Sequence, residues 1–146
     1  MKIAIASDHA GFKYKEEIST YIKSLGHQVL DFGTYSEDSV DYPDFAFPAA
    51  EAVASTVADY GILICGTGIG MSIVSNKVTG IRAALCTTTY MAEMARKHNN
   101  ANVICFGART TTIEEIKKML EIFLSEDFLG DRHMIRIEKI HNLTGN

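Results

Sequence analysis

The stretch Gly61-Ile62-Leu63-Ile64-Cys65-Gly66-Thr67-Gly68-Ile69-Gly70 is an apolar run that ends in a cysteine and continues into glycines at alternate positions. The apolar run predicts a buried strand, and the spacing of Met71-Ser72-Ile73-Val74 predicts a helix after the glycines. Glycine has no Cβ and adopts positive φ readily, so the backbone N–H groups of this loop can converge on an anion. The stretch therefore predicts a strand-loop-helix unit with an anion site beside a thiol.

On both sides of this unit, short β-rich runs alternate with helical patterns, which is typical of βαβ units and a parallel sheet. The expected strands are Lys2–Ser7, His27–Phe32, Tyr60–Cys65, Ile81–Cys86 and Asn102–Phe106. The expected helices are Phe12–Leu25, Pro43 or Pro48 to about Thr56, the segment from the glycine loop to Gly80, Tyr90–Lys97, Ile113–Leu124 and about Arg132–Asn142. The predicted fold class is α/β, a three-layer αβα, Rossmann-like, doubly wound fold with a five-stranded parallel sheet.

Two features of the packing follow from the same patterns. Most strand runs are nearly continuous in apolar residues, which predicts strands that are buried on both faces. On the first helix, one stripe is predicted to point inward, and it consists of Phe12, Ile18, Tyr21, Ile22 and Leu25.

The composition bounds the class of protein. The chain has 146 residues, 47% hydrophobic and 22% charged, with a formal net charge of −4, which predicts one globular domain over residues 1–146 and argues against a nucleic-acid partner. No apolar stretch approaches the ~18 residues that span a bilayer, and we expect neither a membrane span nor a signal peptide. Three cysteines, an odd number at or near the ends of apolar runs, favour reduced thiols and a cytoplasmic protein.

Polar clusters follow all five expected strands. They are Ser7-Asp8-His9, the segment 33–42, Cys65–Gly70, Thr87-Thr88-Thr89 and Gly107-Ala108-Arg109. In doubly wound sheets ligands bind outside the carboxyl ends of the strands, so we expect these loops to meet around one crevice.

Six motifs in order along nearly the whole chain together resemble ribose-5-phosphate isomerase type B. They are Ser7-Asp8-His9-Ala10-Gly11-Phe12, Ser39-Val40-Asp41-Tyr42-Pro43-Asp44, the run from Cys65 to Ser72, Asn76-Lys77, Gly80-Ile81-Arg82-Ala83-Ala84 and His98-Asn99-Asn100-Ala101-Asn102. The resemblance implies interconversion of ribose 5-phosphate and ribulose 5-phosphate through a cis-enediolate, with no metal or nicotinamide cofactor. It also implies a Rossmann-like sheet and a dimer or a larger assembly.

The resemblance assigns a role to each matching residue. Cys65 is the base, helped toward its thiolate form by the loop amides and the next helix N-terminus. Gly66, Thr67, Gly68 and Gly70 supply donors to the enediolate, and Ile69 lies with them at the substrate. Asp8 is placed near the ring oxygen and hydroxyls, His9 near the phosphate, and Tyr42 at the pocket wall. His98 opens the ring with Asn99 beside it, while Arg132, Arg136 and Arg109 bind the phosphate.

Taken alone, many of these residues have plainer interpretations. A cysteine that ends a buried strand is more often an inert core residue, an interpretation we adopt for Cys86 and Cys105. Asp8 fits a helix cap, His98 a helix C-cap, and Arg132 and Arg136 a solvated face. Some relatives have a glutamate base where this chain has Met71. A metal site at His9, Cys65 and His98 has no supporting ligand spacing, and the glycine loop does not match a dinucleotide fingerprint.

The positions of these residues along the chain bear on assembly. His98 and Asn99 precede the fifth strand, whereas Cys65 ends the third, so a strand length of roughly 15–20 Å separates them within one chain. If both act on one sugar, a second copy must bring His98 and Asn99 to the crevice. We therefore expect a homodimer with a shared active site, with a tetramer left open. The helix at about 132–142 then completes the site or the subunit interface.

Two other functions stay open at this stage. One is isomerisation of a six-carbon sugar phosphate, such as allose or galactose 6-phosphate, on the same scaffold. The other is a flavodoxin-like module that binds a phosphate ligand without catalysis, which leaves Cys65 with no chemical task.

Overall fold

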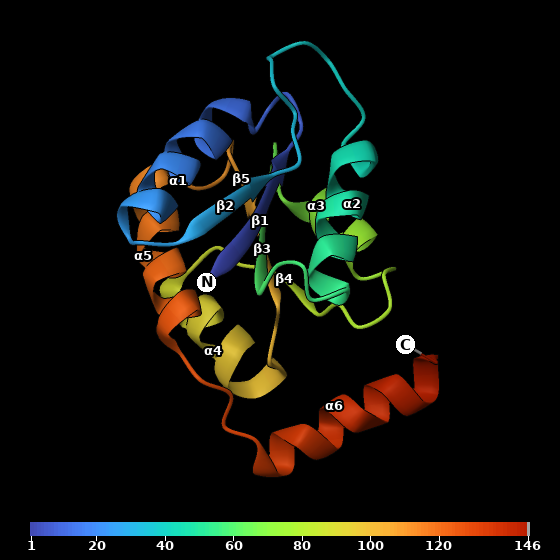
Figure 1. The fold of residues 1–146 in the computed structure, drawn as a ribbon. Coiled ribbons are helices and arrows are strands. Elements are labelled where there is room, and N and C mark those ends of the chain that lie inside the picture. The colour runs from blue at the N-terminus through green and yellow to red at the C-terminus, as the bar shows by residue number, and fades with distance from the viewer. Residues whose placement is uncertain (146) are drawn as a thin grey trace.

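A parallel sheet of five strands runs through the computed structural model, which describes residues 1–145 and leaves residue 146 of the predicted domain outside the described residues (Figure 1). The strands are β1 Lys2–Ser7, β2 Gln28–Asp31, β3 Tyr60–Cys65, β4 Ala83–Leu85 and β5 Val103–Gly107. The helices are α1 Phe12–Ser24, α2 Pro43–Ala54, α3 Ile69–Ser75, α4 Thr89–Asn99, α5 Ile113–Ser125 and α6 Asp131–Thr144.

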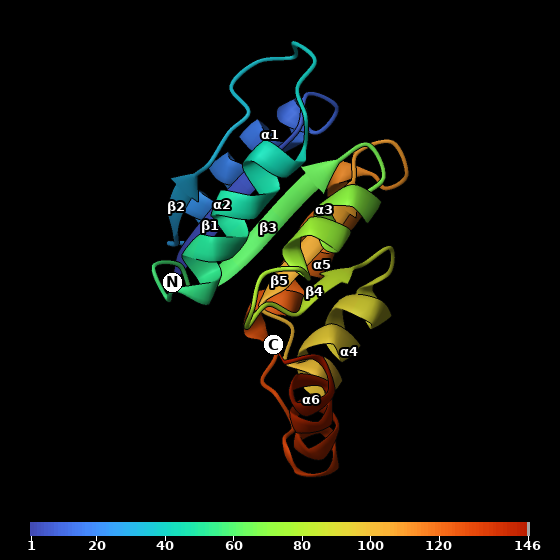
Figure 2. The ribbon, with the colours of Figure 1, turned by 90° about the vertical axis from the view of Figure 1, so that its right-hand side faces the viewer.

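Helices cover both faces of the sheet, which makes three layers. One core lies between the sheet and α1, α4 and α5, and Ile18, Ile116 and Phe123 are among its buried side chains. A second core lies on the opposite face against α2 and α3, with small residues such as Ala46 and Ala50 that let α2 approach the strands closely. Helix α6 lies apart from these layers (Figures 1 and 2). The predicted fold class is confirmed.

The strand order β2-β1-β3-β5-β4 places β1 and β3 side by side at the centre of the sheet. Residues Ile3 to Ser7 of β1 pair with Tyr60 to Ile64 of β3. After β1 the chain passes to β2 on one side, and after β3 it passes to the edge strand β4 on the other side and returns to β5. The carboxyl ends of β1 and β3 therefore flank the topological switch point. Ligand sites of doubly wound sheets lie at such a point.

Three strands and the third helix have other bounds than the sequence predicts. The segments His27–Phe32 and Ile81–Cys86 shrink to the edge strands β2 and β4, which are only partly buried because each has one neighbouring strand. The fifth strand begins and ends one residue later than expected. The third helix ends at Ser75, short of Gly80. The side chain of Asn76 bonds both the N–H and the carbonyl of Ala83, and this ties the connection to β4.

The inward stripe of α1 also differs from the prediction. Leu25 caps the helix and is 42% exposed, because the helix ends before that position turns toward the sheet. Lys15 is buried instead, with an exposure of 0%. Its Nζ lies 2.5 Å from Asp31 Oδ2, and Asp31 Oδ1 accepts a hydrogen bond of 2.8 Å from the N–H of Gly33. The pair therefore anchors the start of the 33–42 segment to α1.

Breaking this partly buried pair has a measurable cost. We expect Lys15→Ala to lower the free energy of unfolding by about 2 kcal/mol, because it removes a fully buried side chain and leaves the Asp31 carboxylate, which is 33% exposed, without its partner. Lys13→Ala on the same helix is the matched control: Lys13 and its partner Glu37 are 76% and 60% exposed, and its loss costs less than about 0.5 kcal/mol. Urea unfolding measures both variants, and equal midpoints for the two would contradict the anchoring role.

Candidate active site

The loops that follow β1, β3 and β5 are joined by backbone hydrogen bonds at the carboxyl edge of the sheet. The N–H of Asp8 donates to the carbonyl of Ile64 at 3.2 Å, and Ala108 N–H donates to Cys65 O at 2.8 Å. Arg109 N–H donates to Gly66 O at 3.0 Å, which holds the arginine over the glycine loop. Polar side chains from three strands are thus brought together beside the switch point.

The glycine loop surrounds the sulfur of Cys65. Cys65 is 5% exposed, and its Sγ accepts a hydrogen bond of 3.1 Å from the N–H of Gly68. Gly68 has φ +78°, and a Cβ there would lie 2.5 Å from a methyl of Leu85 and 2.8 Å from the carbonyl carbon of Phe106. Only glycine fits this position. The loop thereby directs an N–H group at the sulfur and continues into α3.

Asp8 and His9 form the turn that precedes α1. Asp8 Oδ1 accepts hydrogen bonds from the N–H groups of Ala10 and Gly11, at 2.9 and 3.1 Å. The plainer interpretation of Asp8 as a capping residue therefore holds for this oxygen. His9 Nδ1 accepts from the N–H of Val40 at 3.2 Å, so in the neutral ring Nε2 carries the proton and can donate to an anion.

Tyr42 joins the same edge from the start of α2. Its ring packs on the backbone of Gly70, where an added Cβ would lie 2.7 Å from the ring. Thr67 in the glycine loop and Ile69 at the start of α3 are both exposed, and Thr67 Oγ1 accepts a hydrogen bond of 3.4 Å from the N–H of Ile69. We call this group the carboxyl-edge cluster; its members are Asp8, His9, Tyr42, Cys65, Gly66, Thr67, Gly68, Ile69, Gly70 and Arg109.

The other predicted site residues gather at the opposite edge. His98 and Asn99 are the last two residues of α4, which runs two residues beyond the predicted end, and Asn100 with φ +44° is the C-cap in place of His98. Arg132 and Arg136 are exposed on α6. In Figure 2 the arrowhead of β3 and helix α6 lie at opposite ends of the molecule. We call these four residues the α6 cluster.

The structure therefore divides the predicted site into two groups within one chain. Between them runs β5, whose five residues span roughly 16 Å at ~3.3 Å per residue. The separation expected from the sequence is present. One residue of the α6 cluster region was missed by sequence reasoning: His133, whose ring stacks on that of His98. Its position next to Arg132 in the sequence was the available signal for a place near the site, but nothing in the sequence pointed to its contact with His98.

The two remaining cysteines lie in the core. Burial raises the pKa of Cys86 to about 12. Burial also raises the pKa of Cys105, with smaller contributions from the neighbouring Cys65 and Cys86. Both are thus protonated and inaccessible at neutral pH, as the core interpretation requires.

The turn Thr87-Thr88-Thr89 caps the amino end of α4, because Thr88 Oγ1 accepts a hydrogen bond from the N–H of Met91.

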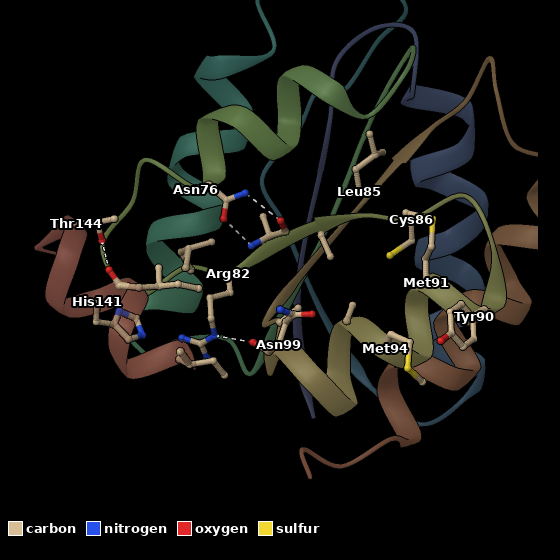
Figure 3. A pocket seen from close by; sticks show the side chains of 17 residues that line it. Asn76, Arg82, Leu85, Cys86, Tyr90, Met91, Met94, Asn99, His141 and Thr144 are labelled. Atoms are coloured by element: carbon tan, nitrogen blue, oxygen red, sulfur yellow. Dashed lines mark hydrogen bonds between the residues drawn. The ribbon is translucent and has the colours of Figure 1, made fainter. Parts of the chain in front are cut away.

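A groove of about 530 Å³ lies outside the carboxyl-edge cluster, between the edge strand β4, α4 and α6 (Figure 3). Tyr90, Met91 and Met94 of α4 line one wall, and Ile140 of α6 lines another. Tyr90 is 67% exposed and Ile140 is 48% exposed, so the groove offers apolar side chains to a partner.

Within residues 1–145, no group of three or more His, Cys, Asp or Glu side chains is placed to hold a metal ion. No helix in the same range has the length and apolar character needed to cross a membrane.

The chain belongs to the Ribose/Galactose Isomerase family, whose model matches residues 3–140. It is 45% identical to ribose-5-phosphate isomerase B of Escherichia coli over 139 residues, which cover 95% of this chain and 93% of that protein. The resemblance predicted from the motifs is confirmed, and the chain is a sugar isomerase of this family.

Solved structures agree with this assignment. Ribose-5-phosphate isomerase B of Clostridium thermocellum superposes with a TM-score of 0.98 at 48% identity, covering 99% of this chain and 98% of the other. The isomerase B of Mycoplasma genitalium, solved with bound ribulose-5-phosphate, superposes with a TM-score of 0.94 at 44% identity and covers 99% of this chain and 97% of its own.

Proposed function

We propose that this isomerase interconverts D-ribose 5-phosphate and D-ribulose 5-phosphate through a cis-enediolate. The observation that carries the proposal is the buried sulfur of Cys65 at the switch point, which accepts a hydrogen bond from the N–H of Gly68 in the glycine loop. An aldose–ketose isomerase needs a base beside C2 and donors for the oxygen that becomes negative, and this loop supplies both. Three relatives are named ribose-5-phosphate isomerase B, and one of them was solved with bound ribulose-5-phosphate.

The proton transfer assigns roles within the carboxyl-edge cluster. The thiolate of Cys65 removes the proton from C2 of the open-chain aldose, and negative charge moves onto O1 as the enediolate forms. Backbone N–H groups of Gly66, Gly68 and Gly70 stabilise that charge, and the hydroxyl of Thr67 donates a hydrogen bond to the sugar. Return of the proton to C1, with transfer of the O2 proton to O1, gives the ketose. His9 Nε2–H and the Arg109 guanidinium bind the phosphate.

Ring opening is assigned to the α6 cluster of a second copy. His98 donates a proton to the ring oxygen as the bond from C1 to that oxygen breaks, and the anomeric hydroxyl releases its proton to form the aldehyde. Asn99 holds the sugar, and Arg132 and Arg136 bind the phosphate with charge-assisted hydrogen bonds. One chain holds these residues a strand length from Cys65, so the homodimer is the catalytic unit.

The groove beside β4 supports this assembly. Ile137 and Ile140 of α6 line it, and Ile135 and Leu143 on the same helix are 67% and 76% exposed. Such a surface on an otherwise well-packed domain is typical of a protein interface. A second copy seated there would cover it and would carry its own α6 toward the carboxyl-edge cluster, so α6 completes the neighbouring site.

The free thiols Cys65, Cys86 and Cys105 fit a reducing compartment, and we assign the enzyme to the cytoplasm.

The test of function is ketose formation from ribose 5-phosphate by the purified protein, with chelator present and no cofactor added. We expect rapid conversion to ribulose 5-phosphate, the reaction for which the relatives above are named. Galactose 6-phosphate is the comparison substrate because the family description includes both activities, and we expect it to be converted much more slowly. Faster turnover of the six-carbon substrate would show that the preferred substrate is a hexose phosphate and not a pentose phosphate. Binding of both sugars without turnover would make the protein a binding module.

Removing one arginine of the α6 cluster separates binding from chemistry. We expect Arg136→Ala to raise KM for ribose 5-phosphate on the order of 10-fold or more and to change kcat by less than ~3-fold, because the phosphate is bound alike in the ground and transition states. Lys139→Ala removes one positive charge from the same helix and serves as the control, with KM near that of the unmodified enzyme. A fall in kcat at constant KM would contradict a phosphate-binding role for Arg136.

A further inference from the structure

The imidazole of His98 lies flat against that of His133. Their ring centroids are 4.2 Å apart and the ring planes differ by 8°. His98 comes from the last turn of α4 and His133 from the first turn of α6. Within residues 1–145 neither imidazole makes a hydrogen bond, so no hydrogen bond fixes the plane of His98, and the stack is the one aromatic contact of its ring.

The connection between α5 and α6 is held against the end of α4 by hydrogen bonds and an ion pair. The N–H of Leu129 donates to the carbonyl of Lys97 at 3.1 Å, directly before His98. Lys97 Nζ lies 3.2 Å from Glu126 Oε2, and Arg96 Nε donates to the Glu126 carbonyl at 3.3 Å. These contacts fix the connection between α5 and α6 against the end of α4, and the stack sits at the end of that connection.

The charges around the stack favour a neutral His133. Partial burial lowers the pKa of His133, and His98 and the two arginines of α6 lower it further, against an opposing effect of Asp131. Two protonated rings at this distance would repel each other. A neutral imidazole, in contrast, can pack face to face on its neighbour whether or not that neighbour carries the proton.

We propose that His133 is a positioning residue for His98, a platform that holds the ring-opening imidazole in one plane. The inference rests on the proposed role of His98 in ring opening and extends it to a residue that itself need not touch the reacting atoms. Without the platform, His98 rotates about its side-chain bonds and meets the ring oxygen in few of its orientations. A displacement of ~1 Å in a catalytic group costs on the order of 100-fold in rate.

The experiment compares two reactions of the whole enzyme. The first is conversion of ribose 5-phosphate, which is mostly a closed furanose and needs ring opening. The second is exchange of the C1 hydrogen of ribulose 5-phosphate in D₂O, followed by NMR. Ribulose 5-phosphate cannot close to a furanose because its C5 oxygen carries the phosphate, so exchange needs the enediolate step alone.

We expect His133→Ala to lower kcat on ribose 5-phosphate by on the order of 10-fold or more while the C1 exchange rate changes less than ~3-fold. His133→Phe keeps a flat ring in the stack and restores kcat to within ~3-fold of the unmodified enzyme. Unchanged kcat in His133→Ala, equal loss of both reactions, or a His133→Phe variant as slow as His133→Ala would each overturn the proposal.

His98→Asn, measured in the same two reactions, separates this inference from the function on which it rests. Full kcat on ribose 5-phosphate in that variant would refute ring opening by His98 itself. Loss of conversion in His98→Asn together with normal conversion in His133→Ala would refute the platform alone.

Discussion

Cys65→Ala is expected to lower kcat for ribose 5-phosphate by on the order of 1,000-fold and to leave KM within ~3-fold, because a positioned general base contributes roughly 100- to 10,000-fold. The sulfur is buried at the carboxyl edge and accepts a hydrogen bond from Gly68, so it is placed for proton transfer more than for binding the sugar. C1 hydrogen exchange in ribulose 5-phosphate is expected to fall by the same factor, since that exchange also passes through the enediolate. Steady-state kinetics and NMR measure the two rates.

Cys105→Ala is the matched control. Cys105 is fully buried in β5, and burial raises the pKa of its thiol, so it takes no part in proton transfer. The loss of its sulfur creates a small cavity that lowers the free energy of unfolding without lowering kcat. A Cys65→Ala variant with the kcat of the Cys105→Ala variant would contradict the assignment of Cys65 as the base.

The carboxyl-edge cluster could be predicted from sequence because its geometry follows from chain order. Parallel strands end at one edge, so the polar residues after β1 and β3 had to meet there once the strands were assigned. The distance between Cys65 and His98 followed in the same way, since one residue ends a strand and the other precedes one. The resemblance supplied the roles, which neither composition nor periodicity could supply.

What the sequence did not reveal depends on contacts between distant elements. The burial of Lys15 depends on its ion pair with Asp31 at the end of β2, which local sequence does not show. The position of Lys15 between Phe12 and Ile18, on the inward stripe of α1, was nevertheless a signal. The exposure of Leu25 depends on where α1 ends, and the shortness of β2 and β4 depends on their edge positions in the sheet. The stack of His133 on His98 needs the α5–α6 connection to fold back on α4, and no local pattern encodes that.

If the active site is shared between two chains, as proposed, mixed dimers of two inactive variants are expected to regain activity. A dimer of Cys65→Ala with His98→Asn contains one site that carries both substitutions and one that carries neither. Random pairing makes half of the dimers mixed, and half of their sites are intact, so the mixture recovers about a quarter of the unmodified activity from two nearly inactive parents. Pairing Cys65→Ala with Asp8→Asn is the control: both substitutions lie in the carboxyl-edge cluster, so every site of a mixed dimer keeps one defect and the mixture is expected to be no more active than the average of its two parents.

A site shared between two chains is tested most sharply by the ribose 5-phosphate turnover of Cys65→Ala and His98→Asn chains, unfolded together and refolded as an equimolar mixture. Recovery to about a quarter of the unmodified rate is expected, with no gain over the parents in the control mixture. Mixed dimers that form, as shown by mass spectrometry of differently tagged chains, and yet stay as inactive as their parents would contradict it. The site would then be complete within one chain.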